Sequence, residues 1–302
     1  MSNGHWSRRE FLTRSAAFGA VAAAGPAVFA ACSSSSTTTS SSGHLSSLQK
    51  SGTVKVGIAG EKPYGYTDSS GRVTGESAEV ARAAFGSLGV HSLQATQVDF
   101  NSLIPGLNAG QFDVVTAGMF ITPARCANAL FSNPDYAAPE AFLVPKGNPQ
   151  GVATYQDVAR KNLTLGVLSG AVEQGYAQQS GVPNGQIQIY SSQNDLLQAV
   201  ESKRVNAASL TNISLNSVVK DNPGANVEVT KPFFPVINGK QQISAGGFVF
   251  RKNDTALVSS FNQQLNALHS NGKWLQIVQP FGFTQENLPG PGVTTASLCA
   301  GS

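Results

Sequence analysis

The 302-residue sequence carries few charged side chains and no concentration of positive charge. Charged residues make up 12% of the chain, about half the share in an average soluble protein, and the formal net charge is only +3. No run of lysines and arginines interrupts this neutral composition. Because binding to nucleic acid depends on such a basic patch, the composition argues against a nucleic-acid partner.

The signatures of common enzyme and metal sites are also absent. The sequence has no Gly-x-Ser-x-Gly elbow, no His-Glu-x-x-His pair and no glycine-rich phosphate loop ending in lysine. Its four histidines and three cysteines are scattered and do not show the spacing of metal ligands. The sequence therefore predicts no catalytic residue, no metal and no cofactor, and it favours a function other than catalysis.

No hydrophobic run is long enough to cross a membrane comfortably. The apolar stretch Ala16–Ala31 has sixteen residues and follows the pair Arg8-Arg9, which stands before Phe-Leu. Paired arginines before such a stretch are typical of a twin-arginine export signal, and small residues directly before Cys32 resemble a lipoprotein cleavage site. We therefore expect export and a lipid anchor at Cys32 on the outer face of the membrane. An ordinary secretory leader is the alternative.

Beyond the leader, a serine- and threonine-rich tract predicts a flexible tether, and strand and helix patterns then alternate. Near Gly246 a strand pattern similar to that of Phe142–Val144 suggests that the chain returns to its first unit. The prediction is an α/β protein with two βαβ lobes, a two-strand hinge and a cleft beside the strand ends; two tandem domains are the alternative. We expect a leader at residues 1–31 and a tether at 32–48. The first lobe would comprise residues 49–143 and 246–290, the second lobe residues 144–245, and the tail residues 291–302.

Aromatic and charged residues follow the strands of the predicted first lobe. Glu61 and Tyr64 come after its first strand, Phe100 after its third, and Phe120 and Arg125 after its fourth. Because the carboxyl ends of parallel strands meet at one edge of a sheet, these side chains are expected to gather there.

Several segments resemble the solute-binding proteins of ABC importers for polar amino acids and related zwitterions. The likeness extends from about Gly52 to Phe283 and rests on Leu103–Leu107, Phe112–Val114, Ala117–Met119 and Ile121-Thr122-Pro123-x-Arg125. It implies a monomer with the type II periplasmic-binding-protein fold, which works outside the cytoplasm and hands its solute to a permease and ATPase.

Three further segments are similar to the members of this family that bind ectoine and hydroxyectoine: Glu61–Asp68, Gly118–Pro123 and Ala245–Lys252. This resemblance implies a small zwitterionic solute. Arg125 would hold its carboxylate with two parallel hydrogen bonds. Glu61 would accept from a ring N–H, and three aromatic rings would face the delocalised cation: Tyr64, Phe100 and Phe120.

The second lobe contributes two expectations. Amino-acid binders of the family carry an Asp-Ala-x-x-x-Asp stretch whose last Asp holds the α-ammonium, but Thr211 stands at that position here. A hydroxyl cannot neutralise a buried ammonium, which argues against a plain α-amino acid. The turn Ser169-Gly170-Ala171 is expected to donate backbone N–H groups to the solute carboxylate.

Three questions stay open at this stage. The solute could instead be a polar amino acid or another compatible solute such as a betaine. An enzyme similar to cyclohexadienyl dehydratase would need a general acid, for which Glu173 is the candidate in the second lobe. Cys126 and Cys299 could form a disulfide in an exported protein or remain two free thiols.

Overall fold

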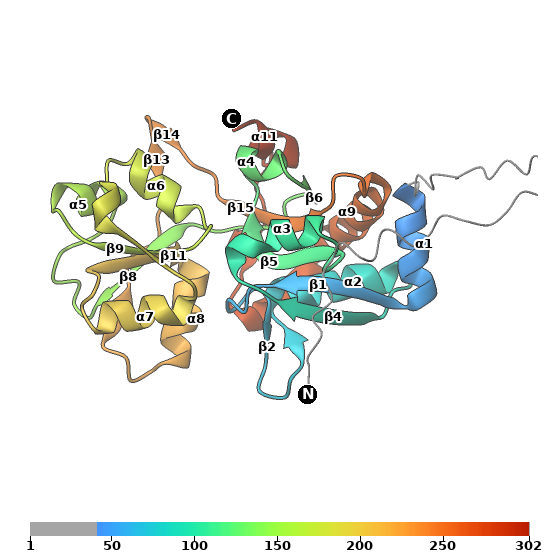
Figure 1. The fold of residues 1–302 in the computed structure, drawn as a ribbon, viewed down its shortest axis with the longest axis horizontal. Helices are drawn as coiled ribbons and strands as arrows, with labels where there is room; N and C mark the ends of the chain where they lie inside the picture. The colour runs from blue at the N-terminus through green and yellow to red at the C-terminus, as the bar shows by residue number, and fades with distance from the viewer. Residues whose placement is uncertain (1–40, 302) are drawn as a thin grey trace, which may run out of the picture. The chain divides into compact units, whose positions relative to one another are not determined.

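The computed structural model describes residues 41–301, which lie in one compact unit. The expected leader, the lipidation at Cys32 and the Ser/Thr tract up to residue 40 fall outside the described residues. The described chain forms two main β-sheets with helices packed against them (Figure 1). No helix within it is both long and apolar enough to span a membrane.

The sheet of the first lobe has the strand order β4-β1-β5-β15-β6, with β7 also pairing with β15. The strands β1, β4 and β5 are parallel, and β15 returns antiparallel to β5. The strands are β1 (Thr53–Ile58), β4 (Ser92–Gln97), β5 (Val114–Phe120), β6 (Leu130–Phe131), β7 (Tyr136–Ala137) and β15 (Ala245–Phe250); β2 (Tyr66–Thr67) and β3 (Val73–Thr74) form a separate hairpin.

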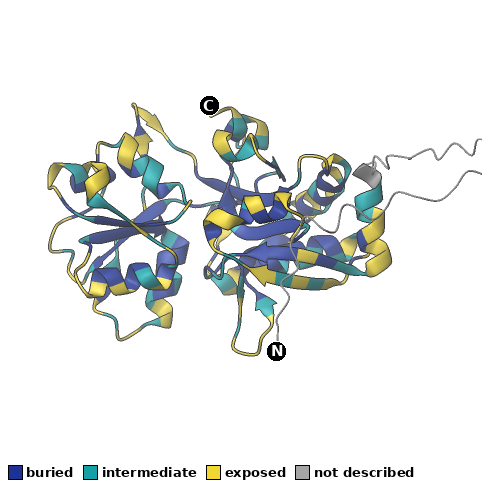
Figure 2. Ribbon diagram, viewed as in Figure 1, coloured by how far each residue is buried: buried dark blue, intermediate teal, exposed yellow. Residues whose placement is uncertain are grey.

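Apolar helix faces cover this sheet. In α9 one apolar stripe is buried, formed by Leu257, Val258, Phe261, Leu265 and Leu268. All six residues of β15 are buried as well, as Figure 2 shows for the central strands. The helices of this lobe are α1 (Ser41–Ser51), α2 (Glu76–Ser87), α3 (Leu103–Asn108), α4 (Pro123–Cys126), α9 (Thr255–Ser270), α10 (Lys273–Val278) and α11 (Thr295–Ala300), with short 3-10 turns η1 (Phe100–Ser102), η3 (Gln279–Phe281) and η4 (Gln285–Asn287).

The second lobe is built on a sheet of order β10-β9-β11-β8-β12. Its strands are β8 (Glu140–Pro145), β9 (Leu165–Leu168), β10 (Ile187–Tyr190), β11 (Ala207–Thr211) and β12 (Val227–Val229), and the hairpin β13 (Val236–Ile237) with β14 (Lys240–Gln241) stands apart. Its helices are α5 (Tyr155–Arg160), α6 (Glu173–Gln179), η2 (Asn184–Gln186), α7 (Gln193–Glu201) and α8 (Asn212–Asp221). This architecture confirms the predicted α/β fold with two lobes.

The chain crosses between the lobes twice, and the two crossing segments lie side by side. Ala138 N donates to Ser244 O at 3.1 Å. The first crossing precedes the predicted boundary at residue 143, because the ladder of β8 with β11 already begins at the pair Glu140–Thr211. The strand around Phe142 therefore belongs to the second lobe.

The N-terminal boundary also differs from the prediction, which placed residues 32–48 in a flexible tether. Residues 41–48 belong to α1, which packs on α9. Leu48 is buried, and His44 hydrogen-bonds Asp113 at 3.2 Å and Asp254 at 2.8 Å. These anchors hold a serine-rich segment whose composition alone indicates a tether.

The C-terminal tail ends in α11, which packs against α4. Cys126 of α4 and Cys299 of α11 form a disulfide with an S–S distance of 2.00 Å. Of the two alternatives left by the sequence, the structure thus contains the bridge.

Candidate functional site

A small cavity of about 30 Å³ lies between the lobes, at the carboxyl ends of β1, β5, β9 and β11. Most of the predicted site residues meet there, while Ser169 and Gly170 do not line it. The lining residues are Glu61, Tyr64, Phe100, Gly118, Phe120, Arg125, Ala171, Val172, Glu173, Leu210 and Thr211.

Glu61 brings a buried carboxyl to the cavity from the loop after β1. Its side chain accepts a hydrogen bond from Ser214 Oγ of α8 at 2.7 Å. Burial raises the pKa of Glu61 to about 8, against the lowering effect of that hydrogen bond, and the nearby Glu173 raises it further. A positive group entering the cavity would therefore favour the ionised form of Glu61.

Tyr64 is held in place by a glycine beneath its ring. Gly118 has φ +59°, and a Cβ there would lie 2.3 Å from Tyr64 Cδ1. The Tyr64 ring packs against Tyr136 at 5.3 Å, and its hydroxyl hydrogen-bonds Thr211 Oγ1 across the lobes at 2.6 Å. Thr211 thus contacts Tyr64, and it also caps α8 by accepting from Ser214 N.

Arg125 is fixed at the start of the short helix α4, where Thr122 accepts from its backbone N–H. Its guanidinium donates to Phe120 O at 2.7 Å and, across the lobes, to Gly170 O at 2.9 Å. The guanidinium carbon lies 5.3 Å from the centre of the Phe100 ring. Within residues 41–301 no carboxylate makes an ion pair with Arg125, so a solute carboxylate would be its first.

The second-lobe turn contacts the first lobe directly. Ser169 Oγ accepts from Asn101 Nδ2 at 3.1 Å. Gly170 has φ +76°, and a Cβ there would meet Asn101 Cα at 2.8 Å, so only glycine allows this approach. Ala171 N donates to Leu168 O at 3.1 Å, within the turn itself. Of the three predicted residues, Ala171 alone lines the cavity.

Glu173 lines the cavity, although the predicted binding set does not include it. Its side chain is 3% exposed, and burial raises its pKa to about 7 against the lowering effect of Arg125. Behind it, Glu140 of β8 is fully buried, and burial together with Glu173 raises its pKa. The sequence signal for Glu173 is its position three residues after Gly170, where α6 begins. Gly118, Val172 and Leu210 also line the cavity, but no comparable signal in the sequence points to them.

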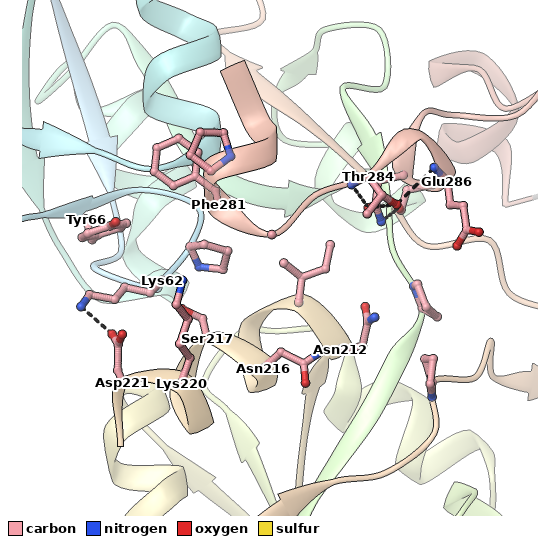
Figure 3. A pocket seen from close by; sticks show the side chains of 18 of the residues that line it. Lys62, Tyr66, Asn212, Asn216, Ser217, Lys220, Asp221, Phe281, Thr284 and Glu286 are labelled. Atoms are coloured by element: carbon pink, nitrogen blue, oxygen red, sulfur yellow. Dashed lines mark hydrogen bonds and ion pairs between the residues drawn. The ribbon is translucent and has the colours of Figure 1, made fainter. Parts of the chain in front are cut away.

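Further contacts close the cleft beside the cavity. Gln193 of α7 accepts from Lys62 N at 2.7 Å and donates to Lys62 O at 3.0 Å. Lys62 Nζ forms an ion pair with Asp221 of α8 at 2.6 Å, on the edge of a second pocket of about 580 Å³ (Figure 3). That pocket is lined by both lobes, with Phe281 on one side and Asn216 on the other (Figure 3).

The cavity combines one guanidinium, two carboxyl groups and several aromatic walls. This set suits a small organic molecule that carries a carboxylate and a positive charge. Within the described residues, no group of three or more histidine, cysteine, aspartate or glutamate side chains is arranged to hold a metal.

Comparison with known proteins agrees with this geometry. The profile of the bacterial extracellular solute-binding proteins, family 3, matches residues 54–284. A probable amino-acid ABC transporter periplasmic-binding protein of Sinorhizobium fredii, y4tE, is 35% identical over 85% of this chain and 86% of its own. The arginine-binding extracellular protein ArtP of Bacillus subtilis is 27% identical over 81% of this chain and 92% of its own.

Among solved structures, the crystal structure of EhuB in complex with hydroxyectoine superposes with a TM-score of 0.77 and 33% identity. The superposition covers 85% of this chain and 98% of the EhuB chain. The two curated relatives are binding proteins by name. The chain belongs to family 3 of the bacterial extracellular solute-binding proteins.

Proposed function

We propose that the protein captures ectoine or 5-hydroxyectoine outside the cytoplasm and delivers it to the permease of an amino-acid-type ABC importer. The observation that carries this proposal is that one cavity contains buried Glu61, several aromatic rings and Arg125, which has no carboxylate partner within residues 41–301. The likeness to EhuB, solved with hydroxyectoine, supports it.

The chemistry of the solute matches the residues one by one. Ectoine has one carboxylate, for which the planar guanidinium of Arg125 can supply two parallel hydrogen bonds. Its cyclic amidinium spreads the positive charge over a flat ring, which aromatic faces such as Phe120 hold well. Its ring N–H groups need acceptors, and Glu61 provides one.

A polar, cationic amino acid is the second candidate, and Glu173 is the observation that favours it. Thr211 lacks the carboxylate that would hold an ammonium in the second lobe, but Glu173 brings one to the same cavity. A relative named as arginine-binding is in keeping with this alternative.

We also propose that the protein binds its solute without converting it, as a monomer attached to the membrane through lipid on Cys32. A dehydratase would use Glu173 as a general acid, since its pKa of about 7 suits proton transfer. Mass spectrometry of prephenate or arogenate incubated with the protein tests this point. Conversion above the buffer blank would replace the binding proposal with an enzymatic one.

The experiment for the solute is a thermal-unfolding panel with ectoine, hydroxyectoine, glycine betaine, L-arginine and neutral polar amino acids. A ligand that binds only the folded state raises the Tm in proportion to the logarithm of its concentration over Kd. We expect the two ectoines to give the largest shifts. A larger shift with L-arginine would select the second candidate.

A further inference from the structure

We propose that Glu76 and Ser77, two buried residues that do not line the cavity, are positioning residues for solute binding. They belong to a chain of hydrogen bonds that extends from Gly118, in the wall of the cavity, to Asp135 inside the first lobe. This inference rests on the proposed function only in requiring that a solute enters the cavity, and it holds for any solute that packs against Tyr64.

Ser77 joins the two residues whose contact shapes this wall. Its backbone N–H donates to Tyr64 O at 3.0 Å, and its hydroxyl oxygen accepts from Gly118 N at 3.1 Å. Gly118 O accepts in turn from the hydroxyl of Tyr136 at 2.7 Å. The N–H and the carbonyl of Gly118 are thus both held, and a Cβ on this residue would lie against the Tyr64 ring.

Glu76 sets the direction of the Ser77 hydroxyl. Ser77 Oγ donates to Glu76 Oε2 at 2.7 Å. A hydroxyl has one proton, so this bond leaves the lone pairs of Ser77 Oγ free to accept the N–H of Gly118. Glu76 and Ser77 are the first two residues of α2, and only 0% and 3% of them are exposed, so water does not replace either partner.

The chain ends at Asp135. Glu76 hydrogen-bonds the carboxyl of Asp135, which also accepts from Trp274 Nε1 at 2.8 Å and lies 3.6 Å from His269 Nε2. Burial, followed by the charge and the hydrogen bond of Asp135, raises the pKa of Glu76 well above its ordinary value. Glu76 therefore keeps its proton and donates it to Asp135, so that every donor in the chain points from Gly118 toward Asp135.

A buried carboxyl that keeps its proton is costly at neutral pH, because the same side chain ionises freely in the unfolded chain. An apolar residue at the start of α2 would avoid this cost. Groups whose ionisation is strongly perturbed gather at functional sites. Behind the cavity wall, Glu76 has such a role, since it fixes Gly118, and with it the Tyr64 ring, before a solute arrives.

The proton on Glu76 makes stability depend on pH. The groups that face Glu76 are Asp135 and Tyr136 at the start of β7 and Tyr64 from the loop after β1, and His269 of α9 reaches the pair through Asp135. The unfolded chain releases this proton above about pH 4.5, whereas the folded protein keeps it, so stability falls as the pH rises from 5 to 8.

Urea unfolding of the parent and of Glu76→Gln between pH 5 and 8 tests this protonation without any solute. The fall in stability should be smaller in Glu76→Gln, by about tenfold in the unfolding equilibrium constant per pH unit. Glu61, Glu140 and Glu173 titrate in both proteins, so their contributions cancel in the comparison. Parallel profiles would overturn the inference, because Glu76 would then have no proton to donate.

Isothermal titration with ectoine at pH 7 tests the positioning role. Ser77→Ala and Glu76→Leu should each weaken binding about fivefold, the value of one ordinary hydrogen bond. Glu76→Gln keeps an acceptor for Ser77 and a donor for Asp135, and it should therefore rescue the affinity that is lost in Glu76→Leu.

Val80→Ala is the control for this titration. Val80 is fully buried one turn further along α2, so its truncation lowers stability, but its side chain takes no part in the hydrogen bonds. Thermal unfolding checks that each variant is folded. Parent-like affinity in Ser77→Ala and Glu76→Leu would overturn the inference, and so would an equal loss of affinity in Val80→Ala.

Should ectoine not bind, the same variants are titrated with L-arginine. The same pattern of loss and rescue would support the positioning role while the ectoine proposal fails, and equal affinities would contradict it. Should neither solute bind, hydrogen exchange at the Gly118 amide decides. Faster exchange in Ser77→Ala than in the exposed control Ser87→Ala supports the chain, and equal exchange contradicts it.

Discussion

At the scale of single residues, the site depends on side chains whose positions are fixed by their neighbours. Arg125 is aligned by Phe120 O and Gly170 O, and Tyr64 is aligned by Thr211 and by the bare backbone of Gly118. Such fixed groups lose little conformational entropy when a solute binds, which favours affinity.

Arg125→Ala should therefore have a large effect on binding. The substitution leaves the solute carboxylate in a closed cavity without its cationic partner, at a cost of about 2–5 kcal/mol in binding free energy. Isothermal titration measures it. Arg204→Ala is the control, because Arg204 is exposed and stacks on Tyr190 in the second lobe. Equal affinities of the two variants would place the carboxylate site elsewhere.

Gly118→Ala should weaken both folding and solute binding. The positive φ alone costs about 1–3 kcal/mol for a residue with a side chain, and the new Cβ must also displace the Tyr64 ring. Gly282→Ala is the control that separates backbone strain from displacement of the Tyr64 ring. Gly282 has φ +89°, but a Cβ there would meet no other atom within 4 Å. Chemical unfolding and titration should show loss of stability in both variants and loss of affinity in Gly118→Ala alone. Unchanged affinity in Gly118→Ala would mean that the position of Tyr64 does not matter for binding.

At the scale of elements, the sequence indicates the strands and helices whose apolar pattern is strong but not those held by a few specific contacts. The stripe of α9 is predictable because five apolar residues repeat along one face. The sequence of α1 indicates a tether instead, since serine dominates it and its anchors, His44 and Leu48, are far in sequence from their partners. Such long-range pairs leave no local pattern.

The ionic attachment of α1 makes stability depend on pH. Hydrogen bonds to Asp113 and Asp254 raise the pKa of His44 to about 9, above its ordinary value of 6.5. A raised histidine pKa adds stability that is complete below about pH 6.5 and is lost as the pH rises through 9. Urea unfolding between pH 6 and 10 should show this loss in the parent and a flatter profile in His44→Gln. The exposed His91→Gln is the control, and a parent-like slope in His44→Gln would contradict the attachment.

The disulfide fixes α4, the helix that carries Arg125, to α11. Removing it in Cys126→Ser/Cys299→Ser should lower the free energy of unfolding by about 2–5 kcal/mol, as for other native disulfides. Because Cys126 directly follows Arg125, the solute affinity should also fall, but by less than in Arg125→Ala. Urea unfolding and titration of the double variant test both effects. Stability equal to that of the oxidised parent would show that the bridge is dispensable.

At the scale of the whole molecule, the two-lobed fold and most of the cavity could be predicted from the sequence. Glu61, Tyr64, Phe100, Phe120, Arg125, Ala171 and Thr211 all line the cavity, because residues that follow parallel strands converge at one edge of each sheet. The contact of Glu140 with Glu173 could not be predicted, since the two residues are far apart in sequence and meet only through the packing of the second lobe.

The central claim is that each chain binds one ectoine-type solute, and a single titration tests it most directly. Isothermal titration of the purified protein with ectoine should show one binding site per chain and a micromolar or lower Kd, with no measurable heat of binding for neutral polar amino acids. Binding of a polar amino acid together with no binding of ectoine would contradict the account.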